Sequence, residues 1–229
     1  MTSTHLMQAQ PDLPPLEPGD HLDQATFHAR YQAMPESLRA ELIGGVVYMP
    51  SPQKPQHGRR NLRLIVWLDE YEAATPGVEV YENTTAILGE YSEPQPDAFL
   101  IVLPTKGGRV RVNKDGYLQG TPELIAETAS TTESYDLHSK KDDYERAGVK
   151  EYVVVALRQR RVFWFIRRRG KFKPLKPGAD GILRSEAFPG LWLDPEAMLR
   201  GDRSRLSTVL QQGLSSPEHA AWVARLASR

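Results

Sequence analysis

Acidic side chains occur within two segments of the sequence that are otherwise apolar. Glu127 lies near the end of LIAETAS (124–130), and Asp97 opens the run DAFLIVL (97–103) directly after a proline. An ionised carboxylate is costly to bury unless a cation or hydrogen-bond donors meet it. Two carboxylates that face each other repel unless a cation intervenes, and two or three oxygen ligands with open positions suit Mg²⁺. The two acids therefore indicate a divalent-cation site if their strands pair.

A lysine that follows the Glu127 strand is a candidate charge partner for it. The next segment predicts a helix over 136–147, ended by Gly148. Residues spaced three, four and three apart form one stripe of that helix: Leu137, Lys140, Tyr144 and Ala147. Lys140 lies inside the stripe and Lys141 at its border, so we expect Lys140 to face Glu127. The alternative is that Lys140 extends along the apolar surface to water.

Each of these residues also has a purely structural interpretation. Asp97 taken alone could be a turn or capping residue, and Glu127 could belong to a structural ion pair. Glu41, a further candidate at the start of ELIGGVVYMP (41–50), could be an exposed acid before a turn. The order of the features favours a shared site. An acid precedes a Gly-Gly hairpin, Pro-Asp opens a strand, a second strand ends in Glu, and a helix with an inward Lys follows.

The elements that must position these residues follow from hydrophobic periodicity and from Gly and Pro. Segments with helical spacing are 24–34, 59–74, 136–147 and the chain from 195, with a break near 215–217. Segments with strand character are 41–50 (a hairpin), 78–88, 96–103, 124–130, 151–157 and 161–167, followed by three short edge elements. Residues 104–121 predict a long loop or an exposed hairpin. Strands that alternate with helices favour an α/β or α+β fold with a mixed sheet, in which the Glu127 strand is central.

The composition is ordinary for a soluble globular protein. The chain has 229 residues, 40% hydrophobic and 25% charged, with 29 Lys+Arg against 29 Asp+Glu. No cysteine is present, which excludes disulfides, zinc–thiolate sites and cysteine nucleophiles. The opening segment lacks the basic and apolar regions of a signal peptide, and the apolar runs are too short to span a bilayer. We therefore expect a cytoplasmic protein without a membrane partner.

One part of the chain is strongly basic although the net charge is zero. Residues 152–179 contain no acid and nine basic side chains, with aromatic residues interleaved. Such a patch is suited to binding phosphates with salt-dependent affinity. The residues expected to contact nucleic acid are Arg59, Arg60, Arg63, Arg167, Arg168, Arg169 and Lys171. The alternative is a solvated hairpin whose aromatics pack inward while its arginines face water.

The order of these features resembles the PD-(D/E)XK nuclease superfamily, and more closely its Uma-type branch of restriction-endonuclease-like proteins. The segments that carry the resemblance are AELIGGVVYMPSPQKPQH, PQPDAFLIV, PELIAETASTTESYDLHSKKDDYERAGVKEYVVV and LRSEAFPGLWLD, which cover roughly residues 24–199. In this branch the motif lysine is displaced from its usual place, two residues after the Glu, onto the next helix. Here Ala129 occupies the usual place, and the pattern D-x-x-x-K-x-x-x-Y matches Asp136, Lys140 and Tyr144.

The resemblance implies an α/β, restriction-endonuclease-like core. This core has a mixed central β-sheet flanked by helices, with an added β-hairpin region and C-terminal helices. The nuclease-like domain is expected over 23–200. The Pro-rich, polar residues 1–22 predict a flexible lead, and the helical pattern predicts a C-terminal helical extension over 201–229. The interval between Asp97 and Glu127 is long for the superfamily, and we expect residues 104–121 to account for the excess.

The implied activity is metal-dependent hydrolysis of phosphodiester bonds in DNA. Asp97, Glu127 and the backbone carbonyl of Thr128 are expected to hold Mg²⁺, with Mn²⁺ as a second candidate ion. Lys140 is expected to be the catalytic lysine and Glu41 an accessory acid. The residues that match supporting positions are His57, Asp136 and Tyr144.

Two other interpretations stay open at this point. A nuclease-fold module that binds nucleic acid or a protein partner without cutting would keep the same residues. An unrelated α/β domain would use Glu127 and Lys140 as a structural ion pair. The C-terminal segment PEHAAWVARLAS has an apolar face that could dock on the body or on a second subunit. A homodimer is therefore an expectation that rests on the resemblance.

Overall fold

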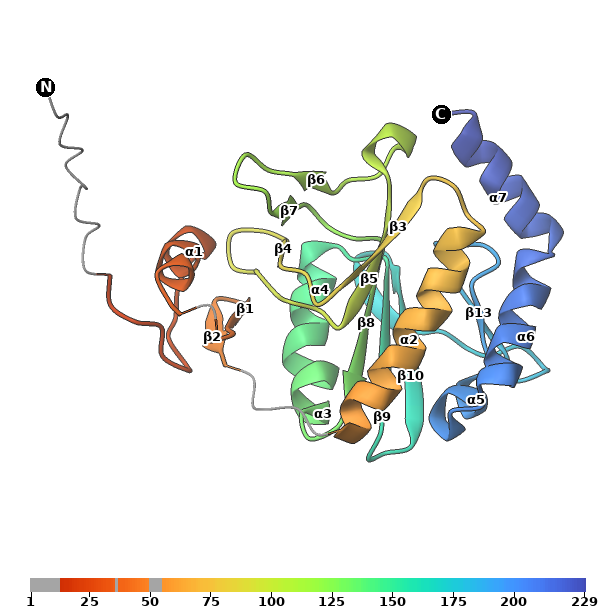
Figure 1. Cartoon of the computed structure of the whole chain (residues 1–229), viewed down its shortest axis with the longest axis horizontal. Helices are drawn as coiled ribbons and strands as arrows, with labels where there is room; N and C mark the ends of the chain where they lie inside the picture. Colours follow the sequence, from red (N-terminus) through yellow and green to blue (C-terminus); the bar gives the residue numbers. More distant parts are fainter. Residues whose placement is uncertain (1–12, 36, 50–54) are drawn as a thin grey trace, which may run out of the picture.

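The computed structural model describes residues 13–35, 37–49 and 55–229 of the chain (Figure 1). A six-stranded mixed sheet forms its centre, in the order β11-β10-β9-β8-β5-β3. These strands are β3 (Val78–Glu82), β5 (Ala98–Val102), β8 (Leu124–Ala129), β9 (Glu151–Ala156), β10 (Arg161–Arg168) and β11 (Lys171–Pro174). Only β8 and β9 run parallel within this sheet, and every other neighbouring pair is antiparallel.

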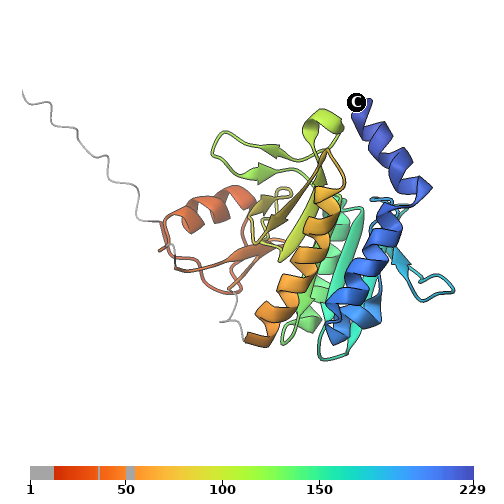
Figure 2. The ribbon, with the colours of Figure 1, turned by 45° about the vertical axis from the view of Figure 1, so that its right-hand side comes forward.

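Helices cover both faces of the sheet. Helix α2 (Pro55–Ala73) lies on one face and α4 (Lys141–Ala147) on the other (Figure 1). The turned view shows α2 and the C-terminal helices on the same side of the sheet (Figure 2). Alternate side chains of β8 point to the two faces, because successive residues of a strand face opposite ways. Leu124 and Ala126 join the core under α2, whereas Ile125 and Ala129 join the core under α4.

The helix that carries Lys140 is longer and less regular than the predicted 136–147. It begins with the short α3 (Glu133–Tyr135), continues through the π-helical turn η2 (Asp136–Lys140) and ends as α4. Gly148 ends it with a positive φ of 86°, as its position in the sequence predicts. The structure thus confirms the predicted helix and adds a π-helical turn that the periodicity did not indicate.

The predicted exposed hairpin over 104–121 is present. It contains the single-turn helix η1 (Pro104–Lys106), β6 (Arg111–Val112) and β7 (Leu118–Gln119), and β7 also pairs with β4 (Ala86–Ile87). This small sheet covers part of the α4 side through Leu118 and Val110. The excess length between Asp97 and Glu127 is therefore a structured insertion beside the main sheet.

The C-terminal part pairs a short hairpin with three helices. Its elements are β12 (Leu183–Arg184), β13 (Trp192–Leu193), α5 (Pro195–Arg200), α6 (Arg203–Leu214) and α7 (Pro217–Ala227). The predicted break near 215–217 separates α6 from α7. Leu206, Leu210 and Leu226 are buried in the same core as the residues of α2. The helices of the predicted extension therefore pack directly on the body of the domain.

The N-terminal part forms a small unit around a hairpin. Its elements are α1 (Gln24–Gln32), β1 (Glu41–Ile43) and β2 (Val46–Tyr48). Leu16 is buried with the apolar side chains of this unit, and the backbone of residues 19–22 is hydrogen-bonded to the hairpin. Residues 16–22 of the predicted lead therefore contact the hairpin, and residues 1–12 of it lie outside the described chain.

In the described residues, no helix combines the length and the apolar character needed to cross a membrane.

Candidate active site

Lys140 lies between two carboxylates that are far apart in the sequence. Its Nζ is 2.9 Å from Oε1 of Glu127 and 3.1 Å from Oε1 of Glu41. All three side chains are buried, and Lys140 is only 5% exposed. The predicted proximity of Lys140 to Glu127 is therefore confirmed, and the alternative of a lysine that reaches water is wrong.

The β1–β2 hairpin brings Glu41 to this position. The backbone N–H of Gly44 in its turn donates to Asp143 of α4 at 3.0 Å. Leu42 pairs with Glu93 on the other side of the hairpin, and the backbone N–H of Gln95 donates to Oε1 of Glu41 at 2.8 Å. These contacts attach the hairpin to both α4 and the chain before β5, and they hold Glu41 over Lys140.

Asp97 and Glu127 lie side by side at the ends of the paired strands β5 and β8. The backbone N–H of Asp97 donates to Oε2 of Glu127 at 3.1 Å, and the N–H of Thr128 donates to Oδ2 of Asp97 at 2.7 Å. Nε2 of His57, on α2, is 3.7 Å from Oδ2 of Asp97. The structure thus brings Asp97, Glu127 and the backbone of Thr128 to one point, as the sequence predicts.

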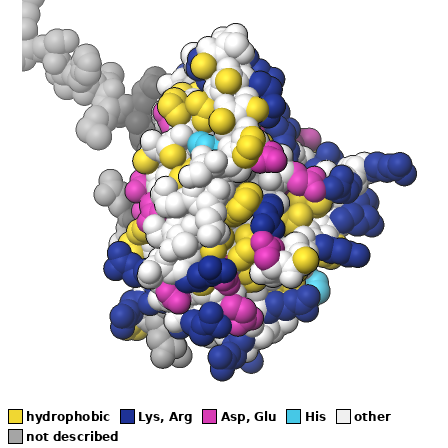
Figure 3. All heavy atoms as spheres, turned by 90° about the vertical axis from the view of Figure 1, so that its right-hand side faces the viewer, with side chains coloured by type: hydrophobic (Ala, Val, Ile, Leu, Met, Phe, Trp, Pro, Cys, Tyr) yellow, Lys and Arg dark blue, Asp and Glu magenta, His cyan; other side chains and the backbone are white. Residues whose placement is uncertain are grey.

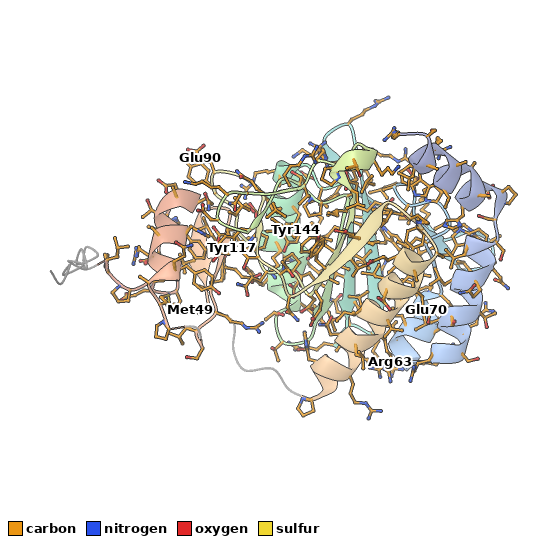
Figure 4. The ribbon with its side chains drawn as sticks, turned by 45° about the horizontal axis from the view of Figure 1, so that its top comes forward. Met49, Arg63, Glu70, Glu90, Tyr117 and Tyr144 are labelled. Atoms are coloured by element: carbon orange, nitrogen blue, oxygen red, sulfur yellow. The ribbon has the colours of Figure 1, made fainter. Side chains whose placement is uncertain are left out.

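Two predicted supporting residues complete the surroundings of Glu127. Tyr144 projects from α4 toward the sheet (Figure 4), and its hydroxyl donates to Oε1 of Glu127 at 3.0 Å. Asp136 is buried next to the ion pair and accepts a hydrogen bond from Oγ1 of Thr132 at 2.8 Å. Both side chains therefore belong to the buried network, Tyr144 by direct contact and Asp136 through its charge.

We call Glu41, Asp97, Glu127 and Asp136 the carboxylate cluster. All four side chains are at least nine-tenths buried, and Lys140 is the one ammonium in contact with them among the described residues. If all four acids ionise, three negative charges stay without a neutralising ammonium. Close buried carboxylates raise one another's pKa unless cations compensate.

The pKa shifts follow from this imbalance. Burial, and then the charge of Glu127, raises the pKa of Asp97 well above its usual range and that of Asp136 to about 7. Burial and Glu127 also raise the pKa of Glu41, although Lys140 opposes this shift. Burial alone would lower the pKa of Lys140, but the surrounding acids outweigh it and raise that pKa well above its usual range. Lys140 is therefore a protonated, fixed ammonium at neutral pH.

Sequence reasoning missed three residues around the cluster. Tyr135 lies under the Lys140 ammonium, 5.4 Å from ring centre to Nζ, and its buried hydroxyl has no hydrogen-bond partner in the described chain. Asn61 meets the hydroxyl of Thr128 at 3.4 Å. Gln95 holds Glu41 through its backbone N–H. The spacing of Asn61 four residues after His57 on one helix face was a usable signal, because such residues are neighbours on a helix.

The donor set fits a hard divalent cation. Mg²⁺ is commonly held by one or two carboxylates and waters, and Asp97, Glu127 and the Thr128 carbonyl would supply two carboxylates and one further oxygen. Within the described residues, no group of three His, Asp or Glu side chains is arranged to bind a metal ion. A set with only two side-chain ligands does not require such a group. The uncompensated negative charge and the unpaired Nδ1 of buried His57 and hydroxyl of Tyr135 also favour a bound cation with its waters.

The predicted basic residues divide between two edges of the sheet. In the strand register, Glu127 of β8 pairs with Val154 of β9, and Val154 pairs with Phe163 of β10. Along this register, the β9–β10 turn lies beyond the end of β8 that carries Glu127. The β10–β11 turn lies beyond the other end. The predicted contacts that fall in the β10–β11 turn and its flanks are Arg167, Arg168, Arg169 and Lys171. These four residues therefore lie away from the carboxylate cluster, and their contact with nucleic acid stays a prediction.

Two of these four residues also have acidic partners. Arg168 pairs with Glu186, and Lys171 pairs with Glu145 at 2.8 Å. The sequence interval 152–179 contains no acid, but the fold supplies acids from the segments on either side of it. The alternative of a solvated hairpin therefore describes this turn well.

The predicted arginines of α2 lie near the site. Arg59, Arg60 and Arg63 occupy the first turns of α2, the same turns that bring His57 and Asn61 to the cluster. Arg60 donates to the backbone carbonyl of Leu199 at 2.6 Å, so it contributes to the attachment of α5. Arg59 and Arg63 line a groove toward α6.

The chain was compared with known families and structures. Residues 25–196 match the Uma2 family, described as "Putative restriction endonuclease". A solved structure with a similar fold is titled as a putative nuclease belonging to DUF820 from Anabaena variabilis ATCC 29413. It is 14% identical, has a TM-score of 0.54, and the match covers 75% of this chain and 97% of that one. No curated protein matches the chain.

At this level of identity the solved structure supports the restriction-endonuclease-like fold alone, whereas the family match spans most of the chain. That match includes all four acids of the carboxylate cluster as well as Lys140. The chain belongs to the Uma2 family, the family of restriction-endonuclease-like proteins described above.

Proposed function

We propose that this protein is an endonuclease that hydrolyses phosphodiester bonds in DNA with the help of a divalent cation. Mg²⁺ is the ion that suits the oxygen ligands best, and Mn²⁺ is the second candidate. The observation that carries the proposal is the carboxylate cluster, four buried acids with a single ammonium among them. The family match and the nuclease-like fold support the same class of reaction.

Asp97, Glu127 and the carbonyl of Thr128 would hold the cation. A bound Mg²⁺ would polarise the scissile phosphate and lower the pKa of a water molecule. Lys140 would present its ammonium to the charge that develops on the phosphate, a role that needs a fixed position. Glu41 and Glu127 hold that ammonium from two sides.

Two further residues would position the ligands. The hydroxyl of Tyr144 shares Oε1 of Glu127 with Lys140, which limits rotation of the carboxylate. His57 faces Oδ2 of Asp97 from α2. These contacts hold the two carboxylates in place before a substrate arrives, which is the condition for effective electrostatic catalysis.

The test is cleavage of plasmid DNA with Mg²⁺ or Mn²⁺ by the wild type, Asp97→Ala, Lys140→Ala and Lys141→Ala. Lys141 is the matched control, because it is the next residue on the helix and lies over the Phe165 ring outside the cluster. We expect cleavage by the wild type and by Lys141→Ala. The other two variants should lose at least about a hundredfold in rate, as expected for removing an electrostatic group from an active site.

A calorimetric titration with Mg²⁺ separates the alternatives. The wild type should bind the ion, and Asp97→Ala should bind it more weakly. If the wild type binds DNA but neither binds metal nor cleaves, the endonuclease proposal is wrong and the non-cleaving module is favoured. If Lys140→Ala and Lys141→Ala cleave equally well, the role of Lys140 is wrong.

A further inference from the structure

A groove between α2 and α6 lies on the outer side of the helix that also contacts the carboxylate cluster. Its volume is about 590 Å³. It is lined by residues of α2 and of the first turns of α6, among them Arg59, Arg63, Glu70, Arg203 and Ser207. Figure 4 shows Arg63 and Glu70 on the side of α2 that faces α6.

Three arginines in this groove have no acidic partner within salt-bridge distance in the described chain: Arg59, Arg63 and Arg203. Glu70 is the one acid among the lining residues, and it accepts a hydrogen bond from Oγ of Ser207 at 3.0 Å. Burial lowers the pKa of Arg63, and the neighbouring arginines lower it further, which reflects unrelieved repulsion between like charges. Clustered guanidinium groups without carboxylates are suited to bind an anion.

The guanidinium of Arg63 lies directly against Gly201 in the α5–α6 link, where glycine has no Cβ to displace it. Gly201 also has a positive φ of 77°, which glycine adopts readily. Arg63 is half-buried, whereas Arg59 and Arg203 are exposed.

The groove and the carboxylate cluster lie at the same level of α2. His57 and Asn61 face the cluster, and Arg59 and Arg63 in the same turns face the groove. A helix with its side chains is about 10–12 Å thick. Each DNA strand carries one charge per ~3.4 Å of axis. A strand that crosses the end of α2 would therefore meet the groove about three to four nucleotides from the phosphate at the cluster.

We propose that the α2–α6 groove binds the phosphodiester backbone of DNA on one side of the cleavage point, through Arg59, Arg63 and Arg203. This inference rests on the proposed function and extends it, because Arg203 lies beyond the family match over 25–196. The C-terminal helices would thus supply part of the DNA-binding surface. On the face that these helices form, Lys and Arg side chains lie toward the lower end with some Asp and Glu side chains among them, and others line the right edge (Figure 3).

The experiment measures binding of a fluorescent DNA duplex in EDTA, at several salt concentrations, so that cleavage plays no part. The variants are Arg203→Gln, Arg63→Lys and the double variant Arg63→Gln/Arg203→Gln. The matched control is Arg225→Gln/Arg229→Gln, which removes the same charge from α7 and the chain end. Each lost phosphate contact reduces the slope of log K against log[salt] by about 0.9.

We expect the double variant to bind about tenfold or more weakly near physiological salt and its salt slope to fall by about two. Arg203→Gln should show about half of that change in slope, and Arg63→Lys, which keeps the charge, should bind nearly as the wild type does. The α7 control should match the wild type. Thermal unfolding of each variant identifies any loss that comes from misfolding.

The inference is overturned if the groove and α7 variants weaken binding equally, or if neither pair changes the slope. It is also overturned if the groove variants keep DNA binding but lose self-association, measured by sedimentation. The groove would then bind a second copy of the chain. If the wild type binds DNA but does not cleave it, and the groove variants still lower the salt slope, the proposed catalysis is contradicted and this inference stands.

Discussion

The arrangement around Lys140 is costly to build and therefore informative. A lysine that is only 5% exposed must be compensated, and two carboxylates within about 3 Å do so. A purely structural ion pair would need one acid, yet Asp97 and Asp136 are buried in the same place. When ionised, the surplus acids destabilise the fold unless another cation binds, which agrees with the proposed metal site.

The surplus predicts how stability depends on pH. Burial and the charge of Glu127 raise the pKa of Asp136 from 3.8 to about 7 in the folded protein. Between these values the folded state binds more protons than the unfolded state, so the free energy of unfolding falls as pH rises. The full change in pKa corresponds to about 4 kcal/mol, of which about 2–3 kcal/mol falls between pH 5 and pH 7.5. Urea unfolding in EDTA at pH 5 and pH 7.5 should show this loss, and Asp136→Asn should reduce it.

The comparison with Asp136→Asn is needed because the pKa values of Glu41 and Asp97 are also raised. Both groups therefore also make the free energy of unfolding fall as pH rises. Asp142→Asn is the matched control, since Asp142 is exposed on the next helix turn. It should keep the pH dependence of the wild type. An unchanged pH dependence in Asp136→Asn would show that Asp136 is already ionised at low pH in the folded protein.

At the scale of elements, the π-helical turn η2 decides which side chains meet at the site. Residues five apart on a regular α-helix point about 140° apart, but a π-turn brings them onto one face. Tyr135 and Lys140 are five apart and lie in contact. Because π-turns are rare and occur often at functional sites, this one agrees with a catalytic role for Lys140.

The strand register predicts which basic turn contacts DNA. Arg161 is level with Ala129 at the end of β8 near the site, whereas Arg167 and Arg169 lie past the opposite end. We expect Arg160→Gln/Arg161→Gln to weaken duplex binding and to lower the salt slope by about two. Arg167→Gln/Arg169→Gln removes the same charge and should change the slope little. Equal effects of the two double variants would show that DNA contacts both edges.

One buried acid helps to hold the β9–β10 turn next to the site. The carboxylate of Glu133, in α3, accepts hydrogen bonds from the backbone N–H groups of Arg158 and Gln159. The turn therefore keeps a fixed position relative to the chain that follows Glu127. This fixed position is the reason to expect an effect from its arginines although their side chains are exposed.

At the scale of the whole molecule, one core joins the sheet to α2, α5, α6 and α7. Leu210 is fully buried in it, next to residues of α2 and the sheet. The division into a lead, a nuclease-like domain and a C-terminal extension stays a prediction, as does the homodimer. Because they share this core, we expect the residues before and after position 200 to unfold as one cooperative unit.

Leu210→Ala should destabilise the whole protein by about 2–5 kcal/mol, because it leaves a cavity in this core. Leu62→Ala is the matched control. Its side chain is 59% exposed, and its loss should cost within about 0.5 kcal/mol. Urea unfolding followed by circular dichroism should give one transition in both variants. Two transitions in Leu210→Ala would show that the C-terminal helices unfold by themselves and would favour the predicted extension.

Much of the fold and the membership of the site could be predicted from the sequence because they depend on local patterns. The short apolar run of β8 placed Glu127 in a buried strand, proline before Asp97 marked the start of β5, and helical spacing turned Lys140 inward. These inferences need only the period of each element and the cost of burying a charge.

Other features were decided only by the tertiary structure. Glu41 reaches Lys140 from 99 residues away because a hairpin packs on α4. The register of the strands alone decides that the β9–β10 turn lies near the carboxylate cluster and the β10–β11 turn lies at the opposite edge of the sheet. The unpaired arginines of the groove are defined by the packing of α6 on α2. Register and packing join residues that are distant in the chain, and no local period encodes such contacts.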